Sequence, residues 1–246
     1  MTGAGRGIGR ALAVGLAAEG ANLVLVARTK SELDETAALV STSARVIAAD
    51  LGDLAQVAAV AKQAGAVDVL VNNAAMPGPI APTATLAPAE YATAIAVNVT
   101  AVAALTIGLL PGMLDRGWGR IVNLSSGAAQ VPEFMLGGNA YTTSKAAVEA
   151  HSVNLAAELA GSGVTVNIYR PGTVDTSMMS WVRGEGGQGL DAKSRSYFAD
   201  VQSRGELLTP EQSAGYLIAR LAGDENGETW HAADGLIDRL GAEGAG

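Results

Sequence analysis

The chain opens with Thr2-Gly3-Ala4-Gly5-Arg6-Gly7-Ile8-Gly9, which leads directly into a predicted helix over Arg10–Glu19. Small residues at such a turn let backbone N–H groups approach a pyrophosphate at the positive end of the helix. A glycine-rich turn is also common as a purely structural feature, so the loop alone is weak evidence. It predicts a dinucleotide site that needs support from the rest of the chain.

Strands and helices alternate after this loop. The predicted strands are Asn22–Ala27, Arg45–Ala49, Val67–Asn72, Gly119–Leu124, Val164–Tyr169 and Glu228–Ala232. The predicted helices are Ser31–Val40 (capped by Ser31), Leu54–Ala64, Glu90–Leu114, Ala140–Ala160 and Pro210–Leu221. This order is typical of an α/β fold with a doubly wound parallel sheet, here a single domain over residues 1–246. A proline-rich loop is predicted at Met76–Pro88, and Met178–Glu206, which has no clear periodicity, is interpreted as a lid or disordered loop. A small glycine-rich tail ends the chain.

Composition excludes several classes of function. The net charge of -8 opposes binding to nucleic acid or to anionic membranes. The chain has no cysteine and only two distant histidines, so a disulfide or a metal site is not expected. Polar residues, glycine and proline interrupt the apolar stretch Val97–Leu114, and the N-terminus has no apolar signal region, so neither membrane spanning nor export is expected. A metal-free cytoplasmic protein fits best.

The end of the strand Asn22–Ala27 indicates which dinucleotide is bound. An acidic residue at this position favours a free ribose 2′-hydroxyl, whereas a cation favours a 2′-phosphate. Here the sequence reads Ala27-Arg28, and Arg6 lies in the glycine loop. NADP(H) is therefore expected in preference to NAD(H), although both arginines could also be solvated surface charges.

Tyr141-Thr142-Thr143-Ser144-Lys145 carries the strongest chemical signal. Residues i and i+4 of a helix share one face, so Tyr141 and Lys145 can act on one ligand. A free phenol has a pKa of about 10, and a nearby ammonium would lower that pKa toward neutrality. Tyr141 could then serve as a general acid or base. The same spacing also occurs by chance on many helices, so its context decides.

Taken together, these motifs resemble the single-domain short-chain dehydrogenase/reductase family along essentially the whole chain. The resemblance extends to Asp50-Leu51, to Asn72-Asn73-Ala74 and to Arg170-Pro171-Gly172-Thr173-Val174-Asp175-Thr176. It implies a Rossmann fold and a nicotinamide cofactor. The cofactor-binding residues that we expect are Gly3, Arg6, Gly7, Ile8, Gly9, Arg28, Asp50, Leu51, Asn73, Ala74, Tyr141, Lys145, Pro171, Gly172, Val174 and Thr176.

The resemblance also implies four catalytic roles. Tyr141 would give its proton to a carbonyl oxygen as hydride arrives from the nicotinamide, and Ser126 would hydrogen-bond that oxygen. Lys145 would bind the nicotinamide ribose and lower the pKa of Tyr141, and Asn98 would hold a water that links Lys145 to solvent. The reverse steps would oxidise an alcohol.

Three details qualify this assignment. We assign the serine role to Ser126, because Ser125 is expected to end the strand with its side chain directed elsewhere. Counting back from Tyr141 by the family's spacing would select Ala128, which cannot act. Ala75 replaces the family's usual glycine and implies a local backbone adjustment, and His151 is interpreted as a packed or interfacial residue.

The expected substrate is a small hydrophobic ketone or secondary alcohol. The apolar side chains expected to wall its pocket, or else only to anchor the lid, are Phe134, Met135, Met178, Met179, Trp181, Tyr197 and Phe198. Reduction of 3-oxoacyl groups on a carrier protein is one subtype, because Arg183, Lys193, Arg195 and Arg204 lie in the lid. The alternatives are a non-catalytic NADP(H) sensor or scaffold and, less well suited to this chain length, an epimerase or dehydratase.

The expected assembly and the expected N-terminus complete the sequence analysis. Glu90–Leu114 and Ala140–Ala160 are apolar on more than one face, which predicts a homodimer or homotetramer. The family resemblance places a buried central strand before Thr2, where this sequence has only Met1. We therefore expect a gap between Asn22–Ala27 and Val67–Asn72, and a natural chain that begins several residues upstream.

Overall fold

The computed structural model describes residues 1–232, and the glycine-rich tail lies outside the described residues. Its strands are β1 (Leu23–Ala27), β2 (Ala44–Ala48), β3 (Val69–Asn72), β4 (Gly119–Leu124), β5 (Val164–Arg170) and β6 (Thr229–His231). Its first five helices are α1 (Gly7–Ala18), α2 (Lys30–Leu39), α3 (Leu54–Ala64), α4 (Pro88–Ile95) and α5 (Ala101–Arg116). The later helices are α6 (Gly127–Gln130), α7 (Asn139–Glu158), α8 (Ser177–Arg183), α9 (Ala192–Ser203) and α10 (Pro210–Leu221). The alternation predicted from the sequence is confirmed.

All paired strands run parallel, and the sheet falls into two parts. β1 pairs only with β2, whereas β3, β4, β5 and β6 form a second part in that order. Met1 and Thr2 join the parts, since Val26 N donates to Met1 O at 3.0 Å and Thr2 N donates to Val71 O at 3.0 Å. The break agrees with the gap expected between these strands. The start of the natural chain stays a prediction.

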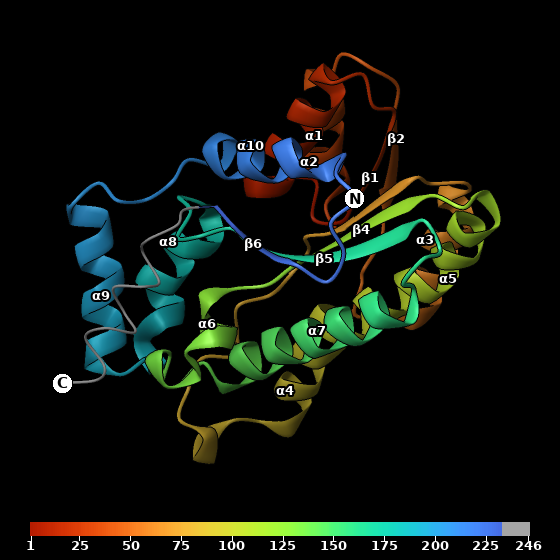
Figure 1. The fold of residues 1–246 in the computed structure, drawn as a ribbon. Helices are drawn as coiled ribbons and strands as arrows, with labels where there is room; N and C mark the ends of the chain where they lie inside the picture. Colours follow the sequence, from red (N-terminus) through yellow and green to blue (C-terminus); the bar gives the residue numbers. More distant parts are fainter. Residues whose placement is uncertain (233–246) are drawn as a thin grey trace.

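Helices cover both faces of the sheet, as Figure 1 shows. α1, α2 and α10 lie on one face, and α3, α5 and α7 lie on the other. Every residue of β4 is buried, and β5 is buried up to Tyr169. Both faces of these strands are therefore covered, as is usual in parallel sheets, although Arg120, Asn123, Thr165 and Asn167 interrupt their apolar pattern. The carboxyl ends of the parallel strands meet at one edge of the sheet, where ligands bind in open α/β folds.

The helix predicted over Glu90–Leu114 contains a change of geometry. α4 and α5 are continuous through a π-helical segment at Ala96–Thr100. By length and composition, Pro88–Arg116 is apolar enough to cross a membrane. However, Leu105, Leu109 and Met113 are buried in the core of this domain, so the segment is interpreted as a core helix.

Two local predictions are wrong. The N-cap of α2 is Thr29 rather than Ser31, and its side chain makes no capping hydrogen bond. Met178–Glu206 is not a disordered loop, because it contains most of α8 and all of α9. The alternative, that this segment is a lid, stays a prediction. Side chains cap both helices: Thr176 accepts from Met179 N and Asp191 accepts from Ser194 N. Both helices stand at one end of the sheet (Figure 1).

Candidate active site

Two adjoining hollows lie at the carboxyl edge of the sheet. The groove nearer the glycine loop contains most of the residues expected to bind the cofactor: Gly3, Arg6, Gly7, Ile8, Gly9, Arg28, Asp50, Leu51, Asn73, Ala74, Tyr141, Lys145, Pro171 and Thr176. Gly172 and Val174 line the other hollow, together with Ser126. Tyr141, Ile8, Pro171 and Thr176 line both. The structure therefore brings the expected site residues together at these two hollows, except Asn98, which lines neither. Their roles stay predictions.

The glycine loop makes a cradle that side chains would fill. A Cβ atom on Gly9 would lie 2.0 Å from the carbonyl oxygen of Gly3, and Gly3 itself has a φ of +64°. Thr2 fastens the loop to the end of β3, because its Oγ1 accepts from Asn73 N at 3.1 Å and from Ala74 N at 3.0 Å. This cradle at the start of α1 fits a dinucleotide pyrophosphate.

The sheet beside this loop is steadied by buried amides. Asn72 Nδ2 donates to Asn123 Oδ1 at 2.8 Å, and Asn123 Nδ2 donates to Ser152 Oγ on α7 at 2.9 Å. Ala75 needs no unusual backbone, since no residue other than glycine has a positive φ in the described part of the chain. The departure from the family's glycine is therefore tolerated without strain at this position.

Charges of both signs line the adenosine end of the groove. Arg28 is exposed and forms no ion pair with any described residue. Arg6 Nη1 lies 3.5 Å from Glu32 Oε1, so the charge of Arg6 is partly compensated. Sequence reasoning missed Glu32, although its place in the first turn of the helix after Arg28 was a usable signal. Arg28 is consequently the freer of the two cations.

Tyr141 lies in the first turn of α7 and is partly buried beside Ser126. Burial raises the pKa of Tyr141, and the Ser126 side chain, acting as a hydrogen-bond partner, lowers it. Ser126 also caps α6, its Oγ accepting from Ala128 N at 3.2 Å. Ser125 Oγ instead donates to Glu149 Oε1 at 2.5 Å, so its side chain is directed elsewhere, as expected. Ala128 is buried and has no group that could act.

Lys145 lies one helical turn after Tyr141 and is only 3% exposed. Its Nζ donates to Leu124 O at 2.7 Å and lies 5.7 Å from the centre of the Tyr141 ring. Burial lowers the pKa of Lys145 to about 8, and the charge of Glu149 opposes that shift. Burial is thus the main influence on the pKa of Tyr141, and Lys145 Nζ is bound to the Leu124 carbonyl. The expected effect of Lys145 on the pKa of Tyr141 stays a prediction.

Asn98 lies in the π-helical segment, is buried and lines neither hollow. Its Nδ2 donates to Met76 O at 3.0 Å and to Ser144 Oγ at 3.0 Å. Its Oδ1 accepts from Met76 N at 2.9 Å. Both amide hydrogens are thus occupied, and the side chain fastens the loop after β3 to α7 beside Lys145.

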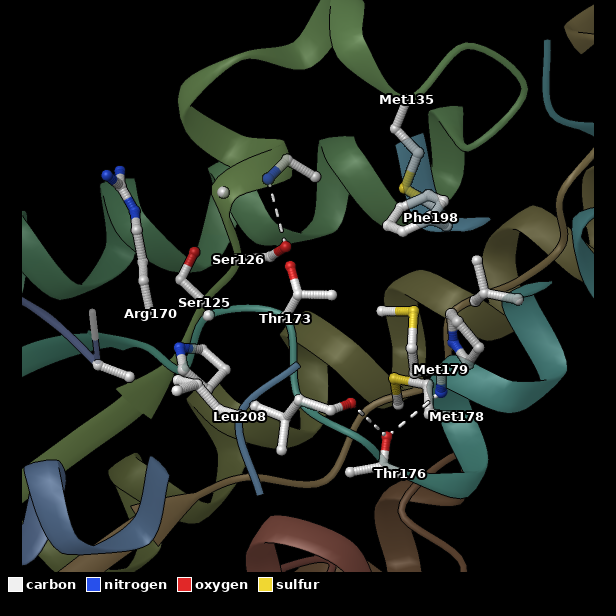
Figure 2. A pocket seen from close by; sticks show the side chains of 18 of the residues that line it. Ser125, Ser126, Met135, Arg170, Thr173, Thr176, Met178, Met179, Phe198 and Leu208 are labelled. Carbon is white, nitrogen blue, oxygen red and sulfur yellow. Dashed lines mark hydrogen bonds between the residues drawn. The ribbon is translucent and has the colours of Figure 1, made fainter. Parts of the chain in front are cut away.

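The second hollow is an apolar pocket of about 180 Å³. Figure 2 shows Ser126 on one side of it and Met178, Met179 and Phe198 on the other. Three aromatic rings pack edge to face. The Tyr197 ring centre lies 4.6 Å from that of Phe134 and 5.3 Å from that of Phe198, and the two phenylalanine ring centres are 6.3 Å apart. Met135 also lines the pocket, whereas Trp181 only packs against its apolar wall. An apolar compound fits such a lining.

Most basic residues of the lid region have partners within the protein. Arg183 lies 3.5 Å from Asp175 with 13% of its side chain exposed. Arg195 Nη1 donates to the carbonyls of Gln188 and Leu190. Arg204 lies 3.2 Å from Glu206, a residue of the pocket wall. These cations therefore do not form a free basic patch.

Comparisons with known proteins agree with this site. The family model described as short chain dehydrogenase matches residues 1–185. The short-chain reductase protein NovJ of Streptomyces niveus is 36% identical over 249 residues, covering 96% of this chain and 92% of that protein. The 2-(R)-hydroxypropyl-CoM dehydrogenase of Xanthobacter autotrophicus is 39% identical over 191 residues, covering 74% of this chain and 76% of that protein.

Solved structures give the same result. An actinorhodin polyketide ketoreductase variant with NADPH superposes with a TM-score of 0.81 at 32% identity, covering 96% of this chain and 95% of that one. The 3-ketoacyl-(acyl-carrier-protein) reductase from Brucella melitensis, complexed with NADH, has a TM-score of 0.82 at 27% identity, covering 95% of each chain. This protein belongs to the short-chain dehydrogenase/reductase family and is an oxidoreductase that acts on alcohol and carbonyl groups.

Proposed function

We propose that the protein is an NADP(H)-dependent reductase of apolar ketones that can also oxidise the corresponding secondary alcohols. The observation that carries the proposal is the position of Tyr141. It lines both the cofactor groove and the apolar pocket, with Ser126 beside it. A carbonyl group at this junction would have its carbon beside the nicotinamide and its oxygen beside the phenol of Tyr141.

Each residue has a defined part in the reduction. When bound, the reduced nicotinamide supplies a hydride to the carbonyl carbon. Tyr141 donates its hydroxyl proton to the carbonyl oxygen, and its raised pKa keeps that proton in place until negative charge develops. Ser126 hydrogen-bonds the same oxygen. Lys145 provides a positive charge beside the resulting phenolate, and a proton from solvent restores the phenol.

The preference for NADP(H) rests on Arg28. Its guanidinium is exposed at the groove and forms no ion pair with any described carboxylate, although Glu32 and Asp50 line the same groove. Charge-assisted hydrogen bonds to a 2′-phosphate are among the strongest of their kind. Structures of similar proteins contain NADPH in one case and NADH in another. The proposed preference therefore rests on the charges of this chain and not on those structures.

For the substrate, the pocket favours a free apolar molecule over a carrier-bound acyl group. Carrier proteins would be recognised by exposed cations, and three of the four lid cations are engaged. We further propose a cytoplasmic homodimer or homotetramer formed through α5 and α7. Ile107 is 71% exposed and Val153 is 54% exposed on these helices.

Turnover of NADPH with a panel of cyclic and aryl ketones tests the function, monitored by nicotinamide absorbance. The wild-type protein is expected to consume NADPH, while Tyr141→Phe loses roughly 10²- to 10⁴-fold in kcat because it lacks the proton donor. Cofactor binding, measured by NADPH fluorescence, is expected to survive in the variant. A protein that binds NADPH but reduces no carbonyl would instead be the non-catalytic sensor.

A further inference from the structure

Glu149 follows Tyr141 and Lys145 on the same face of α7, at successive intervals of four residues. Its side chain is 18% exposed. It lines neither the groove nor the pocket. It is therefore a largely buried carboxylate immediately behind the proposed catalytic pair, and the function proposed above gives it no role.

The carboxylate accepts three hydrogen bonds from two strand ends. Ser125 Oγ donates to Oε1 at 2.5 Å, and Arg170 Nε donates to the same oxygen at 2.8 Å. Arg170 Nη2 donates to Oε2 at 2.7 Å, which completes a bidentate pair. Gln130 orients the same guanidinium by accepting from Nη1 at 2.6 Å. Bidentate carboxylate–guanidinium pairs fix direction as well as distance.

The segments joined in this way all carry parts of the site. Ser125 stands between Leu124, whose carbonyl binds Lys145 Nζ, and Ser126. Arg170 immediately precedes Pro171, which lines the cofactor groove. Figure 2 shows Arg170 and Ser125 on the same side of the pocket. One side chain of α7 thus fastens the ends of β4 and β5 at the point where both strands meet the site.

Glu149 also sets the charge around Lys145. It opposes the effect of burial on the pKa of Lys145, which is about 8. Tyr141 on α7 is another ionisable group near Lys145, and Arg170 on β5 pairs with Glu149. The other ionisable groups that line the same groove as Lys145 are Arg6, Arg28, Glu32 and Asp50, toward its adenosine end.

We propose that Glu149 is a positioning residue of the active site, which holds the ends of β4 and β5 through Ser125 and Arg170 and keeps the Lys145 ammonium charged. The proposed roles of Tyr141 and Lys145 underlie this inference. If the Glu149–Arg170 ion pair were purely structural, it would make the same contacts. Removing the charge of Glu149 or of Arg170 would then leave the titration of Lys145 unchanged.

The test compares Glu149→Gln with Arg170→Gln in the full-length protein. Glu149→Gln removes the negative charge, so the pKa of Lys145 should fall by about half to one pH unit, roughly three- to tenfold in its protonation equilibrium. Arg170→Gln removes the opposing positive charge, so that pKa should rise. The uncharged control Gln130→Ala also removes a hydrogen bond to Arg170 and should leave that pKa unchanged.

Two readouts keep this inference separate from the proposed function. NMR of protein isotopically labelled at the lysine Cε atoms reports the titration of Lys145 without any turnover. The other labelled lysines are Lys30, Lys62 and Lys193. The alkaline limb of kcat/KM for ketone reduction should move in the same direction as the NMR titration. Glu149→Asp retains the charge and should restore the titration even where kcat stays low.

Opposite shifts of the Lys145 titration in Glu149→Gln and Arg170→Gln would support the proposal. Unchanged or parallel shifts, with both variants folded, would overturn it. If either variant fails to fold, Glu149→Asp and the wild type decide by the same titration: a clear downward shift in Glu149→Asp, where the charge is kept, would contradict the electrostatic role. Absence of NADPH consumption by the wild type would count against the proposed function alone.

Discussion

The proposed preference for NADP(H) concerns two arginines whose surroundings differ. Arg28 is exposed at the groove without an ion pair in the described chain, whereas Arg6 lies 3.5 Å from Glu32. A charge-assisted contact contributes about 1.5 to 3 kcal/mol, or roughly ten- to a hundredfold in affinity. Arg28→Ala should therefore remove most of the preference for NADPH, measured as the ratio of kcat/KM for NADPH and NADH. The matched variant Arg6→Ala should have a smaller effect. A wild-type protein that uses both cofactors equally would contradict this prediction.

Lys145 supports the proposed chemistry at a cost in stability. Burial lowers its pKa from the ordinary value of 10.5 to about 8. Below pH 8 the folded and unfolded states are both protonated, so the cost of burying the charge is complete and on the order of a few kcal/mol. Between pH 8 and 10.5 the folded protein releases this proton first, and the cost declines as the pH rises.

Lys145→Met should therefore raise the free energy of unfolding at pH 7 while abolishing turnover. The gain is less than the full charge-burial cost, because the hydrogen bond to Leu124 O is also lost. Urea unfolding at pH 7 and pH 9.5 checks the sign, since the difference between variant and wild type should shrink at the higher pH. A difference that grows with pH would show that the ammonium stabilises the fold.

Site residues that belong to one local motif could be predicted from the sequence. Residues that come together only in the folded chain could not. The spacing of Tyr141 and Lys145 on one helix predicts their proximity. Glu149 continues the same spacing, but its meaning depends on Ser125 and Arg170, which come from two strands far apart in the sequence. The balance between burial and charge at Tyr141 likewise requires the folded surroundings.

At the level of elements, the π-helical segment gives Asn98 its place. It carries the side chain to three partners, Met76 N, Met76 O and Ser144 Oγ, at 2.9, 3.0 and 3.0 Å. Asn98→Ala leaves the N–H and the carbonyl of Met76 without this partner, and each unpaired group costs about 1 to 3 kcal/mol. Ser144 Oγ keeps its hydrogen bond to Tyr141 O. We expect a loss of at least about 2 kcal/mol in urea unfolding, together with reduced kcat.

Thr106 on α5 provides the matched control for Asn98. Its buried Oγ1 has no hydrogen-bond partner in the described structure. Thr106→Val should be neutral or stabilising, because it removes an unpaired polar group without changing volume greatly. Equal destabilisation by Asn98→Ala and Thr106→Val would mean that the hydrogen bonds of Asn98 contribute little.

Helices and strands were predicted well where several sequence signals agree on their bounds. α3, β4 and α10 span the residues expected, since their apolar pattern, capping residues and turns coincide. The helices of Met178–Glu206 were missed because α9 (Ala192–Ser203) has only Ser194 and Val201 buried. Such a helix is held by contacts across the lid, including the hydrogen bond from Ser194 Oγ to Phe134 O at 2.6 Å, which local sequence does not reveal.

At the scale of the whole molecule, the break in the sheet is the main departure from a continuous fold. The strand order and both helical layers were predictable, because parallel strands joined by helices leave few arrangements. Between β1 and β3, however, only Met1, Thr2 and Ala4 provide backbone partners in the described chain. Burial lowers the pKa of the Met1 amine to about 6, and this amine donates to Val24 O at 2.8 Å.

We expect that a strand appended before Met1 would stabilise the domain. Five to seven residues rich in Val and Ile could pair with the inner edges of β1 and β3 and remove the buried amine. Burying about four aliphatic side chains contributes roughly 6 to 12 kcal/mol before the cost of ordering the segment, which is of similar size. A net gain of about 2 to 3 kcal/mol would raise Tm by roughly 4 to 12 °C in a chain of this length. The control is an extension of equal length made of Gly and Ser, which removes the charged terminus without adding a strand. If both extensions give the same Tm, the slot between β1 and β3 does not accept a strand.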